Sequence, residues 1–210
     1  MSQGYFITFE GGEGSGKSTQ IRRLAERLTA SSGREVVLTR EPGGTPGGEE
    51  IRALILNGAV DRWSPVSEAL LMSAARRDHL ERVIRPALAR GAVVLCDRFA
   101  DSTRAYQGQG GAVDAEFIAA LERHVVEDTR PHLTLILDLP VAEGLARAGA
   151  RAGGEERFES KGQAFHERLR AAYLAIAKAE PERCQVIDAA QSQDAVAAAI
   201  EAALAERLGL

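Results

Sequence analysis

Five short runs of apolar and β-branched residues divide the chain, and each predicts a buried strand. The runs are YFITFE (5–10), VVLTR (36–40), VVLCD (93–97), LTLILDL (133–139) and QVID (185–188). They are almost continuously hydrophobic and do not alternate with polar residues. This pattern is typical of parallel strands that are covered on both faces.

Between these runs, apolar residues recur at the spacing of amphipathic helices. The pattern predicts helices over about 17–30, 65–90, 114–126, 163–179 and 193–207, and another that begins at residue 141. Pro86 should interrupt or kink the second of these, where Leu70 and Leu71 are expected in the core. Ser192 is a candidate N-cap for the last. Alternating strands and helices favour one three-layer α/β domain over 1–210, with helices flanking a five-stranded parallel sheet.

Three segments break this alternation and are expected to be loops. They are EPGGTPGGE (41–49), YQGQGGAVD (106–114) and the charged segment RAGGEERFESKG (151–162). Segments of this composition more often carry function or flexibility than core packing.

Composition narrows the class of protein. A net charge of −4 over 210 residues excludes a polycation that would bind nucleic acid along its whole surface, so any anion must be held by a local cluster. The two cysteines, Cys96 and Cys184, lie in apolar runs without metal-ligand spacing and are expected as buried thiols in a reducing compartment. The four histidines form no spaced cluster and are expected at the surface or in packing. No signal peptide or membrane-spanning run is evident, so we expect a cytoplasmic protein.

The segment GGEGSGKS matches the phosphate-loop pattern G-x-x-x-x-G-K-[ST]. It follows a predicted strand and opens a predicted helix, which is the context that separates a phosphate loop from a chance match. Its glycines allow backbone N–H groups to approach phosphate oxygens, and the helix N-terminus adds partial positive charge. Lys17 should reach the β- and γ-phosphates, and the Ser18 hydroxyl should ligate Mg²⁺. The residues expected to bind ATP here are Gly11, Gly12, Glu13, Gly14, Ser15, Gly16, Lys17 and Ser18.

Glu13 needs a separate explanation, because an acid within a phosphate loop repels a polyphosphate. It could bind a metal ion, directly or through water, or accept a hydrogen bond from a substrate hydroxyl. The alternative is a solvated side chain that points away.

The stretch DRFADSTRAYQG predicts a second anion site. Asp97 and Arg98 follow a buried strand, and ligands of parallel α/β sheets bind at the carboxyl ends of the strands. Asp97 could hold Mg²⁺ through water, and Arg98 could bind a phosphate with two hydrogen bonds, unless the two form a simple surface pair. The residues Ser102, Thr103, Tyr106 and Gln107 then offer polar and aromatic groups that suit a ring with polar edges.

Two further arginine-bearing segments are less specific. Arg76 follows Met72 by one helical turn, so it could grip a phosphate while Met72 contacts a base; a solvated arginine is an equal alternative. Arg147, Arg151 and Arg157 surround the segment 151–162, and a mobile lid could bring them over a transferring phosphoryl group. Composition alone favours a solvated loop paired with its own glutamates.

Taken together, these motifs resemble those of bacterial thymidylate kinases over essentially the whole chain. The matching segments are FEGGEGSGKST, TREPGGT, EALLMSAARRDH, DRFADSTRAYQG, RPHLTLILDLP and RFES. The resemblance implies a P-loop fold with a short lid at about 148–160, and transfer of a phosphoryl group from ATP to dTMP with Mg²⁺, in the supply of dTTP for DNA replication. It also implies a homodimer that packs the helix near 65–80.

The resemblance also implies roles for single residues. Glu13 would lie near the dTMP sugar hydroxyl and magnesium, Arg76 and Arg98 would bind the dTMP phosphate, and Tyr106 would disfavour ribonucleotides. Thr103 and Gln107 would read the thymine edge, and Glu41 and Pro42 would line the same pocket. Met72 stands where many relatives stack a phenylalanine on thymine. Arg151 and Arg157 would be the catalytic lid arginines, and Arg147 would lie over adenine.

Two alternatives stay open. Another nucleoside monophosphate kinase, for AMP, GMP or CMP, would share the donor site and differ in the acceptor pocket. A nucleotide-dependent switch would need only one nucleotide, whereas the sequence offers two phosphate-binding clusters.

Overall fold

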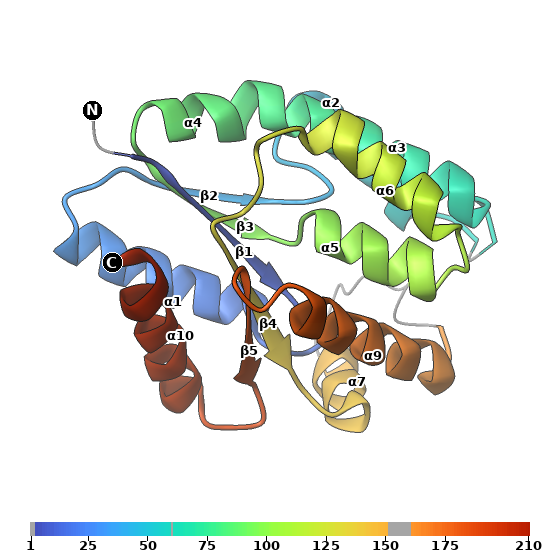
Figure 1. The fold of residues 1–210 in the computed structure, drawn as a ribbon. Helices are drawn as coiled ribbons and strands as arrows, with labels where there is room; N and C mark the ends of the chain where they lie inside the picture. Colours follow the sequence, from blue (N-terminus) through green and yellow to red (C-terminus); the bar gives the residue numbers. More distant parts are fainter. Residues whose placement is uncertain (1–2, 60, 151–160) are drawn as a thin grey trace.

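A five-stranded parallel sheet forms the centre of the molecule (Figure 1). The computed structural model describes residues 3–59, 61–150 and 161–210. The strand order is β2-β3-β1-β4-β5, and all four neighbouring pairs are parallel. The strands are β1 (Tyr5–Glu10), β2 (Val36–Arg40), β3 (Val93–Asp97), β4 (Leu133–Asp138) and β5 (Cys184–Asp188). Each predicted run is a strand, with ends that differ by at most one residue, and the expected α/β class is confirmed.

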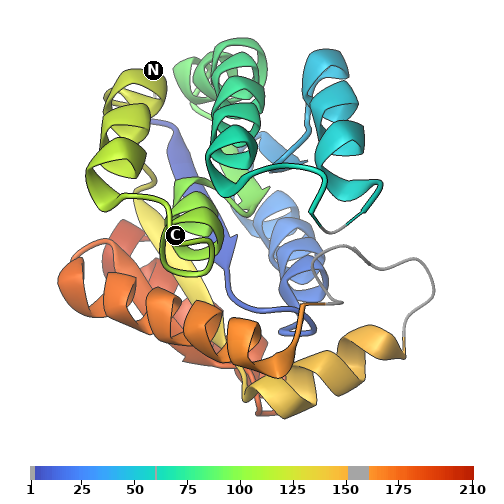
Figure 2. The same ribbon diagram turned by 90° about the vertical axis from the view of Figure 1, so that its right-hand side faces the viewer.

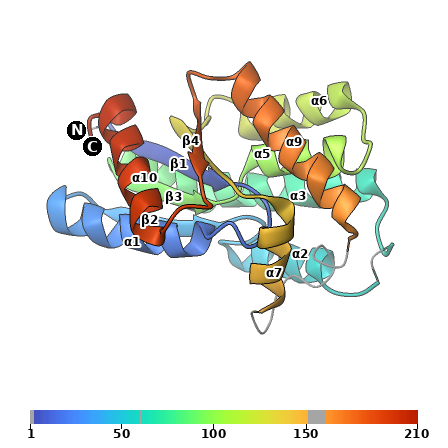
Figure 3. The ribbon, with the colours of Figure 1, turned by 90° about the horizontal axis from the view of Figure 1, so that it is seen from below.

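Helices cover both faces of the sheet, as three layers require. On one face, α1 (Lys17–Ser31) and α10 (Gln193–Leu208) pack side by side, which Figure 3 shows from below. They bury alternate strand residues such as Ile7, Phe9 and Leu95. The other face is covered by the remaining helices, and its core includes the intervening residues Phe6 and Val94. Both cysteines are buried, as expected.

The remaining helical elements position the site. They are α2 (Pro46–Leu56), α3 (Pro65–His79), η1 (Leu80–Ile84), α4 (Arg85–Ala89), α5 (Ala100–Thr103), η2 (Arg104–Gln109), α6 (Ala115–Val126), α7 (Val141–Gly149) and α9 (Gln163–Ala179). The expected interruption near Pro86 is confirmed: α3 passes into the π-helical turn η1 before α4 begins. Pro86 has no N–H to donate to the preceding turn, so a regular α-helix cannot continue unbroken through it.

Three local expectations are wrong. The segment 41–49 is not all loop, because α2 begins at Pro46; Thr45 caps it by accepting a hydrogen bond from the Gly48 amide at 2.9 Å. The segment 106–114 is helical through Gln109, because it continues α5 as the π-helical η2. Leu70 is 48% exposed, so it does not belong to the core.

Among the described residues, no helix is both long enough and apolar enough to cross a membrane.

Candidate active site

The phosphate loop joins β1 to α1 and lies against the start of α7 (Figure 2). Its glycines are required by backbone geometry. Gly14 has φ 69°, and a Cβ there would lie 2.1 Å from the carbonyl oxygen of Gly144 on α7. Gly16 has φ 87° and is the N-cap of α1. Side chains disfavour both conformations, so glycine allows the sharp turn that presents amides at the helix N-terminus.

Lys17 is folded onto the loop that precedes it. Its ammonium group is buried and donates to the carbonyl oxygens of Gly11 at 3.1 Å and Gly12 at 2.9 Å. Burial lowers the Lys17 pKa, and the nearby positive charge of Arg98 acts in the same direction, while Asp97 and Glu13 oppose both. The Lys17 ammonium group therefore lies at the loop. A bound phosphate would offer it a full negative charge in place of the weaker carbonyl dipoles.

Ser18 and Asp97 meet at the carboxyl edge of the sheet. The Ser18 hydroxyl donates to Asp97 Oδ2 at 3.0 Å, and Asp97 ends β3, the neighbour of β1. Within the described ranges, no group of three or more His, Cys, Asp or Glu side chains could hold a metal by itself. One hydroxyl and one carboxylate nevertheless fit Mg²⁺ in a nucleotide complex, because this ion keeps several waters and takes phosphate oxygens as further ligands.

Glu13 points inward, so the solvated alternative is wrong. Its side chain is 9% exposed, and Oε1 accepts hydrogen bonds from Arg98 Nη2 at 2.9 Å and from the Tyr106 hydroxyl at 2.6 Å. Burial alone would raise the Glu13 pKa. The charges of Arg98 and Lys17 and the Tyr106 hydrogen bond outweigh burial and lower this pKa to about 2. Glu13 is therefore ionised, and it links the loop to the second anion cluster.

Arg98 lies between the two predicted anion sites. Its side chain is 12% exposed, which excludes the solvated surface pair with Asp97. Nη1 donates to the Gly11 carbonyl oxygen at 3.1 Å, and the guanidinium carbon lies 5.0 Å from the centre of the Tyr106 ring. The backbone of Arg98 has φ 69°, a left-handed conformation that is uncommon for a residue with a side chain. Such strain often marks a functional position.

Arg76 is buried, so the solvated-arginine alternative is also wrong. Its Nε donates to Glu41 Oε2 at 2.7 Å, and both side chains are at most 5% exposed. Nη2 donates to the Phe99 carbonyl oxygen at 3.0 Å and the Thr103 hydroxyl at 3.1 Å. His79 Nδ1 lies 3.0 Å from Glu41 Oε1. Glu41 thus fixes Arg76 from one side while His79 holds the other carboxylate oxygen.

These side chains line a single pocket, which we call the acceptor pocket. It brings together every residue expected around dTMP except Glu13, which is hydrogen-bonded to two of the lining residues, Arg98 and Tyr106. The residues that line it are Glu41, Pro42, Leu56, Met72, Arg76, Arg98, Phe99, Ser102, Thr103, Tyr106 and Gln107. These residues come from four separate stretches of the chain.

Sequence reasoning missed several residues of this region. Glu68 on α3 accepts a hydrogen bond from Gln107 Nε2 at 2.6 Å, which orients the amide that faces the pocket. Phe99 and Leu56 complete the apolar wall. Glu10 is buried at the end of β1, next to the loop. The sequence could have indicated Glu10, because a carboxylate that ends an otherwise apolar strand needs buried hydrogen-bond partners.

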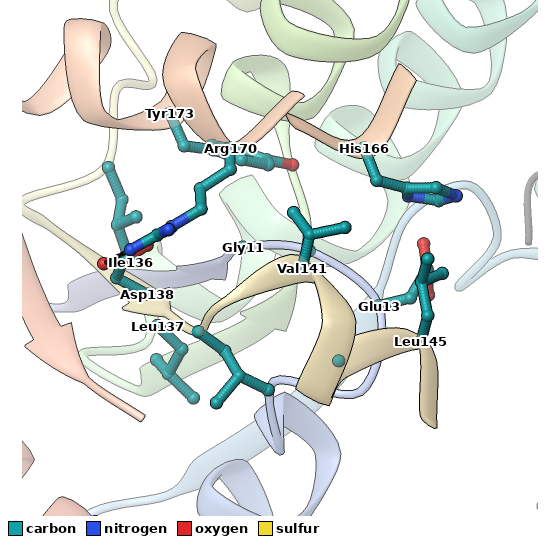
Figure 4. Close-up of a pocket in the computed structure, with 13 residues that line it drawn as sticks. Gly11, Glu13, Ile136, Leu137, Asp138, Val141, Leu145, His166, Arg170 and Tyr173 are labelled. Carbon is teal, nitrogen blue, oxygen red and sulfur yellow. Dashed lines mark hydrogen bonds and ion pairs between the residues drawn. The ribbon is translucent and has the colours of Figure 1, made fainter. Parts of the chain in front are cut away.

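A second pocket lies behind the phosphate loop, between β4, α7 and α9 (Figure 4). Figure 4 shows Arg170 facing Asp138, and the two form hydrogen bonds of 2.7 and 2.8 Å that tie α9 to the end of β4. His166 is buried in the same wall, and its Nε2 forms no hydrogen bond with any residue that the structure describes. Residues of α9 and of the phosphate loop thus line this pocket together.

The expected arginines of the lid are only partly placed. Arg147 lies on α7, and its Nη1 donates to the Ala189 carbonyl oxygen at 3.3 Å, while Nη2 lies 3.5 Å from Glu143 Oε2. Arg151 and Arg157 lie outside the described residues.

Comparison with known proteins gives one family. A family model for thymidylate kinase matches residues 9–200. A thymidylate kinase of Caulobacter vibrioides is 70% identical over 210 residues, which is 100% of both chains. One from Nitrobacter winogradskyi is 58% identical over 207 residues, or 98% of this chain and 90% of its own. The crystal structure of thymidylate kinase from Ehrlichia chaffeensis superimposes with a TM-score of 0.79 at 35% identity, covering 96% of this chain and 99% of that one.

Proposed function

The chain belongs to the thymidylate kinase family and transfers a phosphoryl group from ATP to dTMP, and we propose that the phosphate loop and the acceptor pocket divide this work. The observation that supports the division is the Arg98–Glu13 pair, which joins the two regions at 2.9 Å. A phosphate held by the loop and a phosphate held in the acceptor pocket would meet at this pair.

On the donor side, loop amides and Lys17 would hold the ATP phosphates. Ser18 and Asp97 would hold Mg²⁺, which neutralises charge on the transferring phosphoryl group when it is bound. Lys17 is held at the loop by uncharged groups, the carbonyl oxygens of Gly11 and Gly12 and the Ser15 hydroxyl, so its charge is available to an incoming phosphate.

On the acceptor side, Arg76 and Arg98 would bind the dTMP phosphate, and Gln107 and Thr103 would face the base. Both arginines are held by carboxylates before substrate arrives, which reduces the ordering needed on binding. The attacking atom is a phosphate oxygen that is already anionic. The reaction therefore needs no general base, and catalysis consists of alignment and cancellation of repulsion between two polyanions.

Several further assignments rest on family resemblance. We propose that 1–210 is one domain whose lid at about 148–160 supplies Arg151 and Arg157, with Arg147 near adenine, and that the protein works in the cytoplasm as a homodimer. Exposed apolar side chains support the dimer: Leu54 on α2 and Val66 and Leu70 on α3 are 40–48% exposed.

Steady-state kinetics of Arg98→Ala tests the division directly. We expect the KM for dTMP to rise by about 10²-fold while the KM for ATP changes less than about threefold, because the only substrate contact proposed for Arg98 is the charge-assisted one to the dTMP phosphate. Arg90→Ala is the matched control, since Arg90 forms an exposed pair with Glu35 far from the pocket. Equal increases in both KM values would remove Arg98 from the acceptor site.

A substrate panel tests the base preference. Turnover of dTMP, dUMP, dCMP and AMP under one set of conditions should be fastest for dTMP. Faster turnover of AMP would favour a different nucleoside monophosphate kinase.

A further inference from the structure

Three oxygen-bearing side chains beside Arg98 form a hydrogen-bonded cluster, and only one of them, Ser102, lines the acceptor pocket. Glu10 ends β1, Ser102 lies on α5, and Tyr173 comes from the middle of α9. The Ser102 hydroxyl lies 2.6 Å and the Tyr173 hydroxyl 3.0 Å from the same oxygen, Glu10 Oε2, and both donate to it. The other oxygen, Oε1, accepts the Phe99 amide at 2.8 Å. We call Glu10, Ser102 and Tyr173 the hydroxyl cluster.

The hydroxyl cluster also contacts the guanidinium of Arg98. Nη1 of Arg98 lies 3.2 Å from the Tyr173 hydroxyl oxygen and 3.4 Å from the Ser102 hydroxyl oxygen. Each hydroxyl has only one hydrogen. When Glu10 is ionised, its Oε2 can accept both hydrogens, and both hydroxyl oxygens, which lie 2.9 Å from each other, are then left as acceptors towards Arg98. A single buried carboxylate thereby sets the direction of two hydrogen bonds to the arginine.

Tyr173 belongs to the wall of the pocket behind the loop, and it is not among the residues that line the acceptor pocket (Figure 4). Its ring is 1% exposed, and it packs with the apolar residues of α9. Tyr173 therefore reaches the acceptor pocket only through the residues it contacts there, Arg98 and Ser102. This separates it from Tyr106, whose ring faces the acceptor pocket itself.

We propose that Tyr173, oriented by Glu10, is a positioning residue that holds the Arg98 guanidinium in place for the acceptor phosphate. Arg98 needs such support for two reasons. Its backbone has the left-handed φ of 69°, and Glu13 pulls the other terminal nitrogen, Nη2, towards the phosphate loop. Contacts on Nη1 fix the plane of the Arg98 guanidinium. A misplaced guanidinium would lose one of its two hydrogen bonds to the dTMP phosphate.

The inference rests on the proposed role of Arg98, and Tyr173→Phe is the variant that tests it. The change removes one oxygen and keeps the buried ring. We expect the KM for dTMP to rise about 5- to 20-fold, the KM for ATP to change less than twofold, and kcat to fall less than KM rises. Tyr5→Phe is the matched control: Tyr5 begins the strand that Glu10 ends, and its kinetic constants should not change.

A double-mutant cycle separates positioning from general loosening of the structure. In an Arg98→Ala background, Tyr173→Phe should raise the KM for dTMP less than twofold further, because the group that it positions is absent. Additive effects, an equal rise in both KM values, or no effect of Tyr173→Phe would overturn the inference. If Tyr173→Phe does not fold, Glu10→Gln carries the same cycle with the same criteria, because it alters the hydrogen bond to Tyr173 and Glu10 does not line the acceptor pocket.

The same data distinguish two kinds of failure. If Arg98→Ala raises the KM for dTMP and Tyr173→Phe does not, only the positioning role falls. If Arg98→Ala itself leaves that KM unchanged, the acceptor assignment falls and the positioning role falls with it.

Discussion

The phosphate loop and the acceptor pocket are both proposed to bind anions, yet they are built in different ways. The loop is eight consecutive residues (11–18) whose binding groups are mostly backbone amides and one lysine. The acceptor pocket collects side chains from four stretches of the chain, and its two arginines are buried against carboxylates. Function in the loop thus depends on local backbone geometry, whereas function in the pocket depends on charge compensation between distant segments.

This difference has an energetic consequence. A backbone cradle loses little stability when the side chain of its lysine is shortened. A buried ion pair loses much more when one partner is removed, because the remaining charge stays buried without compensation. Substitutions in the two regions should therefore separate loss of activity from loss of stability.

The largest effect is expected from Lys17→Ala. Turnover should fall by about 10³-fold or more, because the only side-chain cation of the loop is lost from the transferring phosphates. The free energy of unfolding should hardly change, because burial already disfavours the charged form of Lys17 and lowers its pKa. A coupled assay of ADP release measures kcat, and thermal unfolding measures stability. Activity close to that of the unmodified protein would remove Lys17 from the donor site.

Arg76→Ala should do the opposite and affect stability most. Glu41 would remain buried without its arginine, so we expect the free energy of unfolding to fall by about 3 kcal/mol. Arg82→Ala is the control, since Arg82 pairs with Asp78 at the surface and should cost less than about 1 kcal/mol. Denaturant unfolding of the two variants compares them. Equal losses would show that burial of the Arg76 pair does not matter.

The two carboxylates at the junction should give opposite pH dependences. The Glu13 pKa is lowered to about 2, so its contribution to stability is present above about pH 4.5 and is lost as the pH falls towards 2. The Glu10 pKa is raised to about 7, mainly by burial and by the charge of Asp101. The contribution of Glu10 to stability is therefore present below about pH 4.5. It is lost as the pH rises through 7, because the buried carboxyl group must then ionise.

Unfolding measured against pH checks these signs. Glu10→Gln should flatten the curve between about pH 4.5 and 7, and Glu13→Gln should flatten it below about pH 4.5, each by about 3 kcal/mol. If both substitutions flatten the same range, the contrast between the two sites is wrong.

The smallest effect is expected from Thr45→Ala. Thr45 caps α2 and donates to Asp78 Oδ2 at 2.5 Å, so it supports the loop that carries Glu41. The free energy of unfolding should fall by about 1 kcal/mol, and the KM for dTMP should rise about twofold without a change in the KM for ATP. Kinetics and unfolding of Thr45→Ser, which keeps the hydroxyl cap, provide the control. An effect on ATP alone would place this support on the donor side.

The same contrast explains what the sequence could predict. The loop was predictable because its binding residues are contiguous and lie between a predicted strand and a predicted helix. Strand positions were equally clear, because each is an almost continuous apolar run, but burial on both faces was expected of all five and the edge strands β2 and β5 are only partly buried. The start of α2 at Pro46 was missed because the glycines around it obscured the capping threonine.

The carboxylates that pair with the arginines of the acceptor pocket were harder to predict from the sequence. The sequence indicated Arg76 and Arg98 as candidates, but it left solvated alternatives open because their carboxylates, Glu41 and Glu13, are 35 and 85 residues away. The hydroxyl cluster joins residues up to 163 positions apart, and only the packing of α9 against the sheet brings them together. The roles of single residues in binding dTMP stay predictions.

Calorimetry tests the central claim most directly, namely that the two regions hold two nucleotides at once. The protein would be saturated with Mg²⁺ and a non-hydrolysable ATP analogue and then titrated with dTMP. We predict that one dTMP binds per chain while the analogue stays bound, and that Arg98→Ala weakens only the dTMP step. Displacement of the analogue by dTMP would contradict the account, because it would show one shared site.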